Sequence, residues 1–122
     1  MYASIGKCCI SRNRITSSQA ILGIFDFKGL DVEFLYYNLS SRTKELIALG
    51  QTGTQSNLSK KIVSEILVNT PVDVQEQRAI AEVLSDMDEE IAGIEVELEK
   101  AKNVKTGMMQ QLLTGKVRLE VA

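Results

Sequence analysis

Two polar segments of this 122-residue chain carry side chains suited to binding a hydrogen-bonding, anionic partner. Residues 11–19 read SRNRITSSQ, and residues 51–61 read QTGTQSNLSKK. Arginine, asparagine and glutamine can form paired hydrogen bonds with base edges, whereas lysine, serine and threonine suit phosphate groups. The segments therefore favour nucleic acid as a ligand. The candidate residues are Arg12, Asn13, Arg14, Gln19, Gln51, Thr52, Thr54, Gln55, Ser56, Asn57, Lys60 and Lys61.

The composition of these segments leaves a second interpretation open, in which both are ordinary solvated loops. Net charge divides unevenly along the chain, because residues 1–70 carry +3 and the remainder carries −5. A mildly basic first part gives only weak support for contact with a polyanion. Nucleic-acid binding therefore needs support from the rest of the chain.

The chain lacks the residues on which most catalytic and metal sites depend. It has no histidine, which excludes Ser-His-Asp triads and most zinc sites. It has no G-x-x-x-x-G-K-[ST] phosphate loop, and its single proline excludes a double-proline methyltransferase motif. Acidic pairs are frequent only in the second half, where solvated helix faces explain them. We therefore expect no enzyme activity, no metal and no cofactor.

The cysteines and the apolar runs indicate a cytoplasmic protein. Cys8 and Cys9 are adjacent, a spacing that strains a mutual disulfide, so we expect reduced thiols. No apolar stretch is long enough for a membrane span, and we expect neither a membrane helix nor a signal peptide.

A small mixed domain must position the polar segments. Alternation over residues 2–10 and apolar runs at residues 19–27 and 65–69 predict strands. Asp31 is placed to cap a helix that ends at Gly50 and can break at residues 40–41. We predict an α+β head over residues 1–72, with about four or five short strands and one or two helices, followed by a helical region over residues 73–122.

A long helix is predicted from about residue 74 to residue 114. Asp73 and Glu76 form a variant of the capping box, and Gly115 suits the left-handed position that commonly ends a helix. A second cap-like pair, Asp86 with Glu89, marks residues 85–88 as a place for a kink or a short break. At 1.5 Å per residue the helix spans about 60 Å, too long for the rest of the chain to cover.

One face of this helix carries an apolar stripe, which we call the seam. Its members are spaced alternately by four and three residues, the repeat of a left-handed coiled coil. The alternative is a helix packed on its own domain, which usually shows a broader stripe. The seam comprises Ile80, Leu84, Met87, Ile91, Ile94, Leu98, Ala101, Lys105, Met108 and Leu112.

Charge along the helix favours pairing with a second copy in the antiparallel sense. Residues 79–99 carry eight acids and no base, and residues 100–118 carry five bases and no acid. The helix dipole explains such a distribution at the ends but not in the middle. In an antiparallel pair the acidic half of each chain faces the basic half of the other. We therefore predict an antiparallel homodimer.

Several stretches resemble one known family, the specificity subunits of type I restriction-modification enzymes. Residues 50–91 and 105–119 are similar to the end of a target recognition domain running into the conserved helix of that subunit, and residues 4–21 and 30–39 are similar to the later part of such a domain. The most specific motif residues are Pro71, Glu76, Gln77, Ile80, Ala81, Leu84 and Asp88, with the L-L-T-G-K run at residues 112–116.

The resemblance implies a DNA-recognition component without catalysis of its own. Family members carry two recognition domains and two helices in one chain, and the helices pair as an antiparallel coiled coil. Each domain reads half of a split site in double-stranded DNA. The subunit docks methyltransferase subunits, which use S-adenosylmethionine, and through them the ATP-driven restriction subunits. We expect neither cofactor on this chain.

Only one such helix and the later part of one recognition domain are present here. We therefore predict a specificity-subunit fragment or half-subunit that dimerises through the seam. Apolar residues off the seam are expected to contact helices of the methyltransferase subunit. The alternative is a truncated coiled-coil interaction module that does not bind DNA. The predicted docking residues are Val83, Val96, Val104, Met109 and Leu113.

Overall fold

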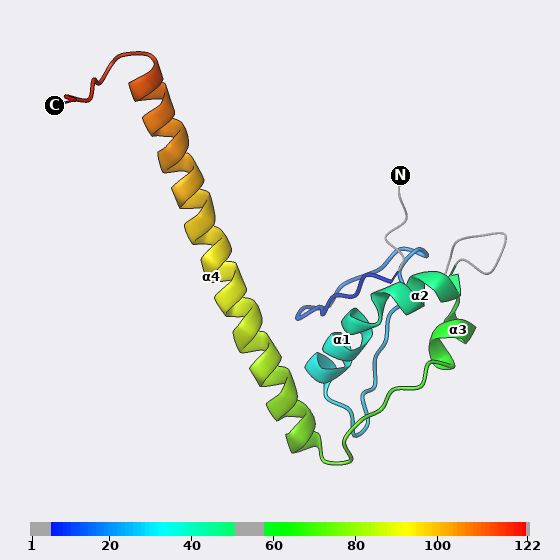
Figure 1. Ribbon diagram of the computed structural model, residues 1–122. Coiled ribbons are helices and arrows are strands. Elements are labelled where there is room, and N and C mark those ends of the chain that lie inside the picture. The colour runs from blue at the N-terminus through cyan, green and yellow to red at the C-terminus, as the bar shows by residue number, and fades with distance from the viewer. Residues whose placement is uncertain (1–5, 51–57, 122) are drawn as a thin grey trace. The chain divides into compact units, whose positions relative to one another are not determined.

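The computed structural model describes residues 6–50 and 58–121. Its helices, in chain order, are α1 (Val32–Ser41), α2 (Thr43–Gly50), α3 (Lys60–Ser64) and α4 (Val74–Leu113). The chain divides into two compact units, Met1–Leu84 and Ser85–Ala122. The first unit holds α1, α2, α3 and the first turns of α4, and the second holds the remainder of α4 (Figure 1).

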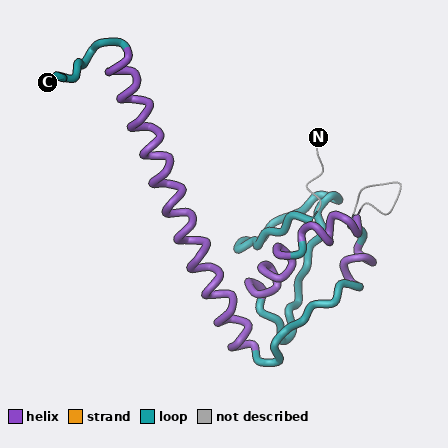
Figure 2. Tube along the Cα trace, viewed as in Figure 1, coloured by secondary structure: helices purple, strands orange, loops and turns teal. Residues whose placement is uncertain are grey.

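The prediction of an α+β fold for the head is wrong, because the described residues form helices and loops without any strand (Figure 2). Of the expected strands at residues 2–10, 19–27 and 65–69, residues 2–5 lie outside the described residues, and the others are irregular or in turns. The backbone hydrogen bonds near residues 21–27 are local, from the Ile21 N–H to the Ser18 carbonyl and from the Lys28 N–H to the Asp26 carbonyl. An alternating pattern favours extended backbone, but a strand also needs a neighbouring backbone to pair with.

Helix α1 begins at the expected cap. The carboxylate of Asp31 accepts hydrogen bonds from the backbone N–H groups of Glu33 and Phe34, both at 3.0 Å. These bonds satisfy donors that have no partner within the helix. The helical segment expected to end at Gly50 is divided in two, since Arg42 leaves helical geometry between α1 and α2.

Arg42, between α1 and α2, also contacts the segment that leads into α4. Its guanidinium donates to the Leu67 carbonyl at 2.6 Å and to both carboxylate oxygens of Glu45, at 2.7 and 2.8 Å. The hydrogen bonds from Arg42 to Glu45 and the positive charge of Arg42 lower the pKa of Glu45. The contact therefore stabilises the fold above the ordinary pKa of glutamate and weakens as pH falls through the lowered pKa.

The core of the first unit is small and lies where α1 meets α2. Leu35, Leu39 and Leu46 form its buried cluster, with half-buried Cys8, Leu30, Leu58, Ile66 and Val68 around it. Gly6 passes close by at φ 77°, and a Cβ there would lie 3.2 Å from the Thr43 carbonyl oxygen.

Both cysteines are free thiols. Burial raises the pKa of the Cys8 thiol, and the charge of Cys9 raises it further.

Helix α4 begins and ends close to the predicted residues. Asp73 accepts a hydrogen bond from the Gln75 N–H at 2.9 Å, and Gly115, at φ 74°, follows the last turn. The Gly115 N–H donates to Leu112 and the Val117 N–H to Gln111, as at many helix ends that terminate in a left-handed residue. The helix continues without interruption through residues 85–88, so no break occurs there.

Within the described ranges, no helix has the length and apolar character needed to cross a membrane.

Candidate DNA interface and helix pairing surface

The first polar segment is exposed and is held at one point on α1. Arg12 donates to the Glu33 carboxylate at 2.9 Å, an ion pair open to solvent. The Ser11 hydroxyl donates to the Asn13 carbonyl at 2.6 Å and so closes a local turn. Arg14 forms no ion pair with any described residue. Among described residues, Arg12 is thus paired with one carboxylate, whereas Arg14 has no ion-pair partner.

The second polar segment is described only in part. Gln51, Thr52, Thr54, Gln55, Ser56 and Asn57 lie outside the described residues. Lys60 and Lys61 are exposed at the start of α3, where the Ser59 hydroxyl accepts from the Ile62 N–H at 3.3 Å. Figure 1 shows the first segment, in dark blue, at the α1 side of the unit and α3 at the other side of α2. Among described residues, the backbone segments that carry the two sets of basic residues therefore lie apart in the first unit.

The seam is accessible to a partner along its length. The exposed fraction of its residues is 37% at Ile80 and Leu84 and reaches 58% at Ile94. Only Gln77 and Ala81 are buried in α4, so beyond Leu84 the helix has no buried residue. Large apolar side chains in a regular exposed row mark an interaction surface rather than a solvated face. Pairing through the seam stays a prediction.

The predicted docking residues are also exposed. Their exposed fractions run from 48% at Met109 to 78% at Leu113. The polar side chains around them are solvated, as in the Lys102–Glu99 ion pair at 2.8 Å, which spans three residues of the helix. Such exposed pairs contribute little to stability.

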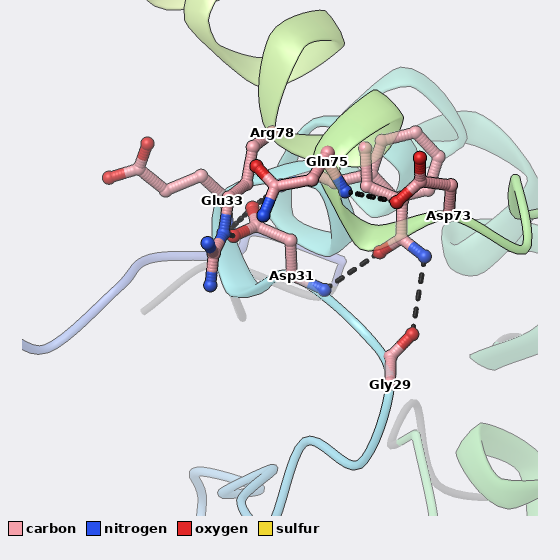
Figure 3. Close-up of polar contacts among 8 residues, drawn as sticks. Gly29, Asp31, Glu33, Asp73, Gln75 and Arg78 are labelled. Carbon is pink, nitrogen blue, oxygen red and sulfur yellow. Dashed lines mark hydrogen bonds and ion pairs between the residues drawn. The ribbon is translucent and has the colours of Figure 1, made fainter.

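The structure adds one residue that the sequence analysis did not assign to a site. Gln77 is 1% exposed, and its side-chain oxygen accepts from the Asp31 N–H at 2.8 Å. Its amide nitrogen donates to the Gly29 carbonyl at 3.2 Å and to the Pro71 carbonyl at 2.9 Å. Figure 3 shows Gly29 and Asp31 beside the first turn of α4. The sequence held a signal for its burial, because Gln77 lies three residues before Ile80 and so continues the repeat of the seam.

No group of three or more potential metal-ligating side chains occurs within the described part of the chain. The arrangement instead presents basic loops on the first unit and an unpaired apolar stripe on α4. Both features are exposed on the described residues, as binding surfaces for macromolecules usually are.

Comparison with known proteins identifies the class. Residues 1–103 match the type I restriction modification DNA specificity domain, so this chain belongs to that family. The resemblance inferred from the sequence is therefore confirmed.

Two relatives come from Methanocaldococcus jannaschii. The type I restriction enzyme MjaVIII specificity subunit is 32% identical over 114 residues, which cover 92% of this chain and 26% of the relative. The putative type I restriction enzyme MjaX specificity subunit is 29% identical over 119 residues, 97% of this chain and 28% of the relative. This chain thus spans about a quarter of the length of these relatives. No solved structure matches it significantly.

Proposed function

We propose that this chain is a DNA-recognition component of a cytoplasmic type I restriction-modification system, without catalytic activity of its own. Residues 1–72 form the DNA-binding head, and residues 73–122 pair with a second copy and dock the methyltransferase subunit, through which the restriction subunit joins. The observation that carries the proposal is the family match over residues 1–103, which includes the head and most of α4. Exposed basic residues on the head and the exposed seam support it.

The pairing is antiparallel in this proposal. If the overlap is centred between Leu98 and Ala101, residue numbers in facing layers add up to about 199 under the heptad repeat. Lys105 then faces Ile94 of the second copy, and its ammonium reaches water near Glu95 and Glu97 of that copy. A polar seam position of this kind lowers stability but selects one register. Two heads at opposite ends of the pair would read the halves of a split DNA site.

One rival function explains the seam equally well. A truncated interaction module would pair through α4 and have a head that binds no DNA. The ion pair that Arg12 forms with Glu33 is compatible with this rival, because it reduces the free positive charge of the first segment. DNA binding by the head separates the two functions.

Binding to duplex DNA should weaken steeply with salt if the proposal holds. Each phosphate neutralised contributes a slope of about −0.9 to the log–log dependence of affinity on salt. Replacing both Arg12 and Arg14 by alanine should weaken binding and flatten the slope, and so should replacing Lys60 and Lys61. Lys44→Ala, an exposed lysine on α2 outside both segments, is the matched control. Gel shifts across a salt series measure both quantities, and no complex with any duplex at low salt would favour the rival.

Charge introduced on the proposed docking face should prevent methyltransferase binding while leaving pairing intact. Val104→Glu combined with Met109→Glu places two carboxylates where apolar contact is expected, and burying an unpaired charge is strongly unfavourable. Gln110→Glu adds a negative charge at a neighbouring exposed position and serves as control. Co-purification with the methyltransferase subunit, together with the mass of the dimer by light scattering, tests this. Unchanged co-purification would remove these residues from the docking face.

A further inference from the structure

Gln77 joins the start of α4 to the distant segment that leads into α1 and to the loop just before α4. Its amide contacts Gly29 and Asp31, which lead into α1, and Pro71, which precedes α4. Both amide donors and one acceptor site are used within a buried environment, where an unsatisfied polar group is unfavourable. The contacts also fix the direction of the amide, because only its oxygen can accept from the Asp31 N–H.

Neighbouring contacts hold the same junction. Asp31 both caps α1 and approaches Arg78, whose Nε lies 3.6 Å from the carboxylate, so the start of α1 is linked to the first turn of α4 (Figure 3). Ala81 lies one turn after Gln77 and is 1% exposed, and its small side chain allows close packing there. The junction therefore combines directional hydrogen bonds with a buried small side chain, and both favour one orientation of the helix.

We propose that Gln77 is a positioning residue that fixes the first turns of α4 against the head and thereby sets the spacing between the two half-sites recognised by a pair. This inference rests on the proposed function. Each added base pair moves a half-site by about 3.4 Å and rotates it by about one tenth of a turn. A head that can turn on its helix would accommodate several spacings, whereas a fixed head selects one.

The exchange of the Asp31 amide proton tests the contact in the unmodified chain. Hydrogen bonding to Gln77 should protect this amide, and Gln77→Glu should raise its exchange rate by about tenfold or more. The introduced carboxylate keeps the length of glutamine but places an oxygen against the carbonyls of Gly29 and Pro71. Gln75→Glu, on the same turn but exposed, is the matched control and should leave the rate unchanged. An Asp31 amide that exchanges as fast as an unstructured one in the unmodified chain would overturn the proposal.

Pulsed dipolar measurements test positioning separately from stability. Spin labels at residues 44 and 90 are introduced with Cys8→Ala and Cys9→Ser, and labelled chain is diluted with unlabelled chain to suppress coupling between copies. The distance distribution should be narrow and should broaden with Gln77→Glu but not with Gln75→Glu. If Gln77→Glu does not fold, Gln77→Met, which keeps an unbranched apolar chain of similar length, replaces it. A distribution that stays narrow in a folded Gln77 variant overturns the proposal.

DNA with two half-sites and a variable spacer gives the functional readout. The unmodified chain should prefer one spacer length, and the Gln77 variant should bind several lengths with affinities within about twofold, because its heads no longer hold one orientation. A variant that binds with unchanged spacer preference overturns the role in specificity. The exchange and distance measurements require no DNA. Failure to bind DNA would therefore refute the proposed function while leaving the positioning role standing.

Discussion

Spin labels at residue 114 of two paired chains should lie about 40 Å apart. In the antiparallel register each label is about 14 residues from the centre of the overlap, and a helix rises 1.5 Å per residue. The charge distribution should favour this orientation, because the acidic half of each α4 would then face the basic half of the other. Each exposed pair contributes only a few tenths of a kcal/mol, so seam burial, at about 25 cal/mol per Å², supplies most of the affinity.

The same experiment distinguishes the other arrangements. A separation below about 20 Å would indicate a parallel pair, because both labels would then lie at the same end. Absence of coupling would indicate a monomer. Ile94→Glu, which places a carboxylate in the middle of the seam, should abolish the coupling, and Glu95→Gln, on the adjacent exposed position, should preserve it. Loss of coupling in both variants would argue against a role for the seam.

Leu46→Ala should destabilise the first unit by about 2–5 kcal/mol. Leu46 is 4% exposed and contacts Leu35 and Leu39, so shortening it leaves a cavity between α1 and α2. A small domain has a total stability near the lower end of about 5–15 kcal/mol, and this one has few buried apolar residues. The variant should therefore be largely unfolded at room temperature. Urea unfolding followed by circular dichroism measures the change.

Leu67→Ala is the matched control for this substitution. Leu67 is 85% exposed, and the Arg42 contact involves its backbone carbonyl rather than its side chain. Its replacement should change the free energy of unfolding by less than about 0.5 kcal/mol. Equal effects of the two substitutions would mean that the leucine cluster does not stabilise the unit.

The helix ends were predictable from this sequence because their signals are local. Asp31 and Asp73 accept hydrogen bonds from the first turns of α1 and α4, and Gly115 has the positive φ expected after a last turn. Capping depends on one side chain and a few neighbouring N–H groups, so it can be recognised without the tertiary structure. The bounds of α4 follow from such signals at both ends.

Strands and the Gln77 contacts were not predictable by the same reasoning. A strand depends on a second backbone segment, and Ile21 and Phe25 are mostly exposed in the structure rather than buried in a sheet. Gln77 bonds with Gly29 and Asp31, 48 and 46 residues earlier, and no local pattern encodes such a pairing. Its place in the seam spacing indicated the buried face but not the partners.

The surroundings of the basic candidate residues were also not predictable from residue types alone. Composition identified Arg12 and Arg14 together, yet the structure pairs only Arg12 with Glu33. The difference depends on how the first segment lies against α1, which residue types alone do not determine. Its consequence is that the two arginines need not contribute equally to DNA binding, and they are best replaced one at a time as well as together.

We expect Gly93 and Gly107 to make the order of α4 depend on protein concentration. A Cβ at either residue would meet open space, so neither glycine is required by close packing in the single chain. Each lowers helix stability by about 1 kcal/mol relative to alanine, and a helix without tertiary contacts is marginal in water. Beyond Leu84 the helix has no buried residue to offset this loss. Association with a partner shifts the balance by mass action, so dilution should reduce the helix content of this region.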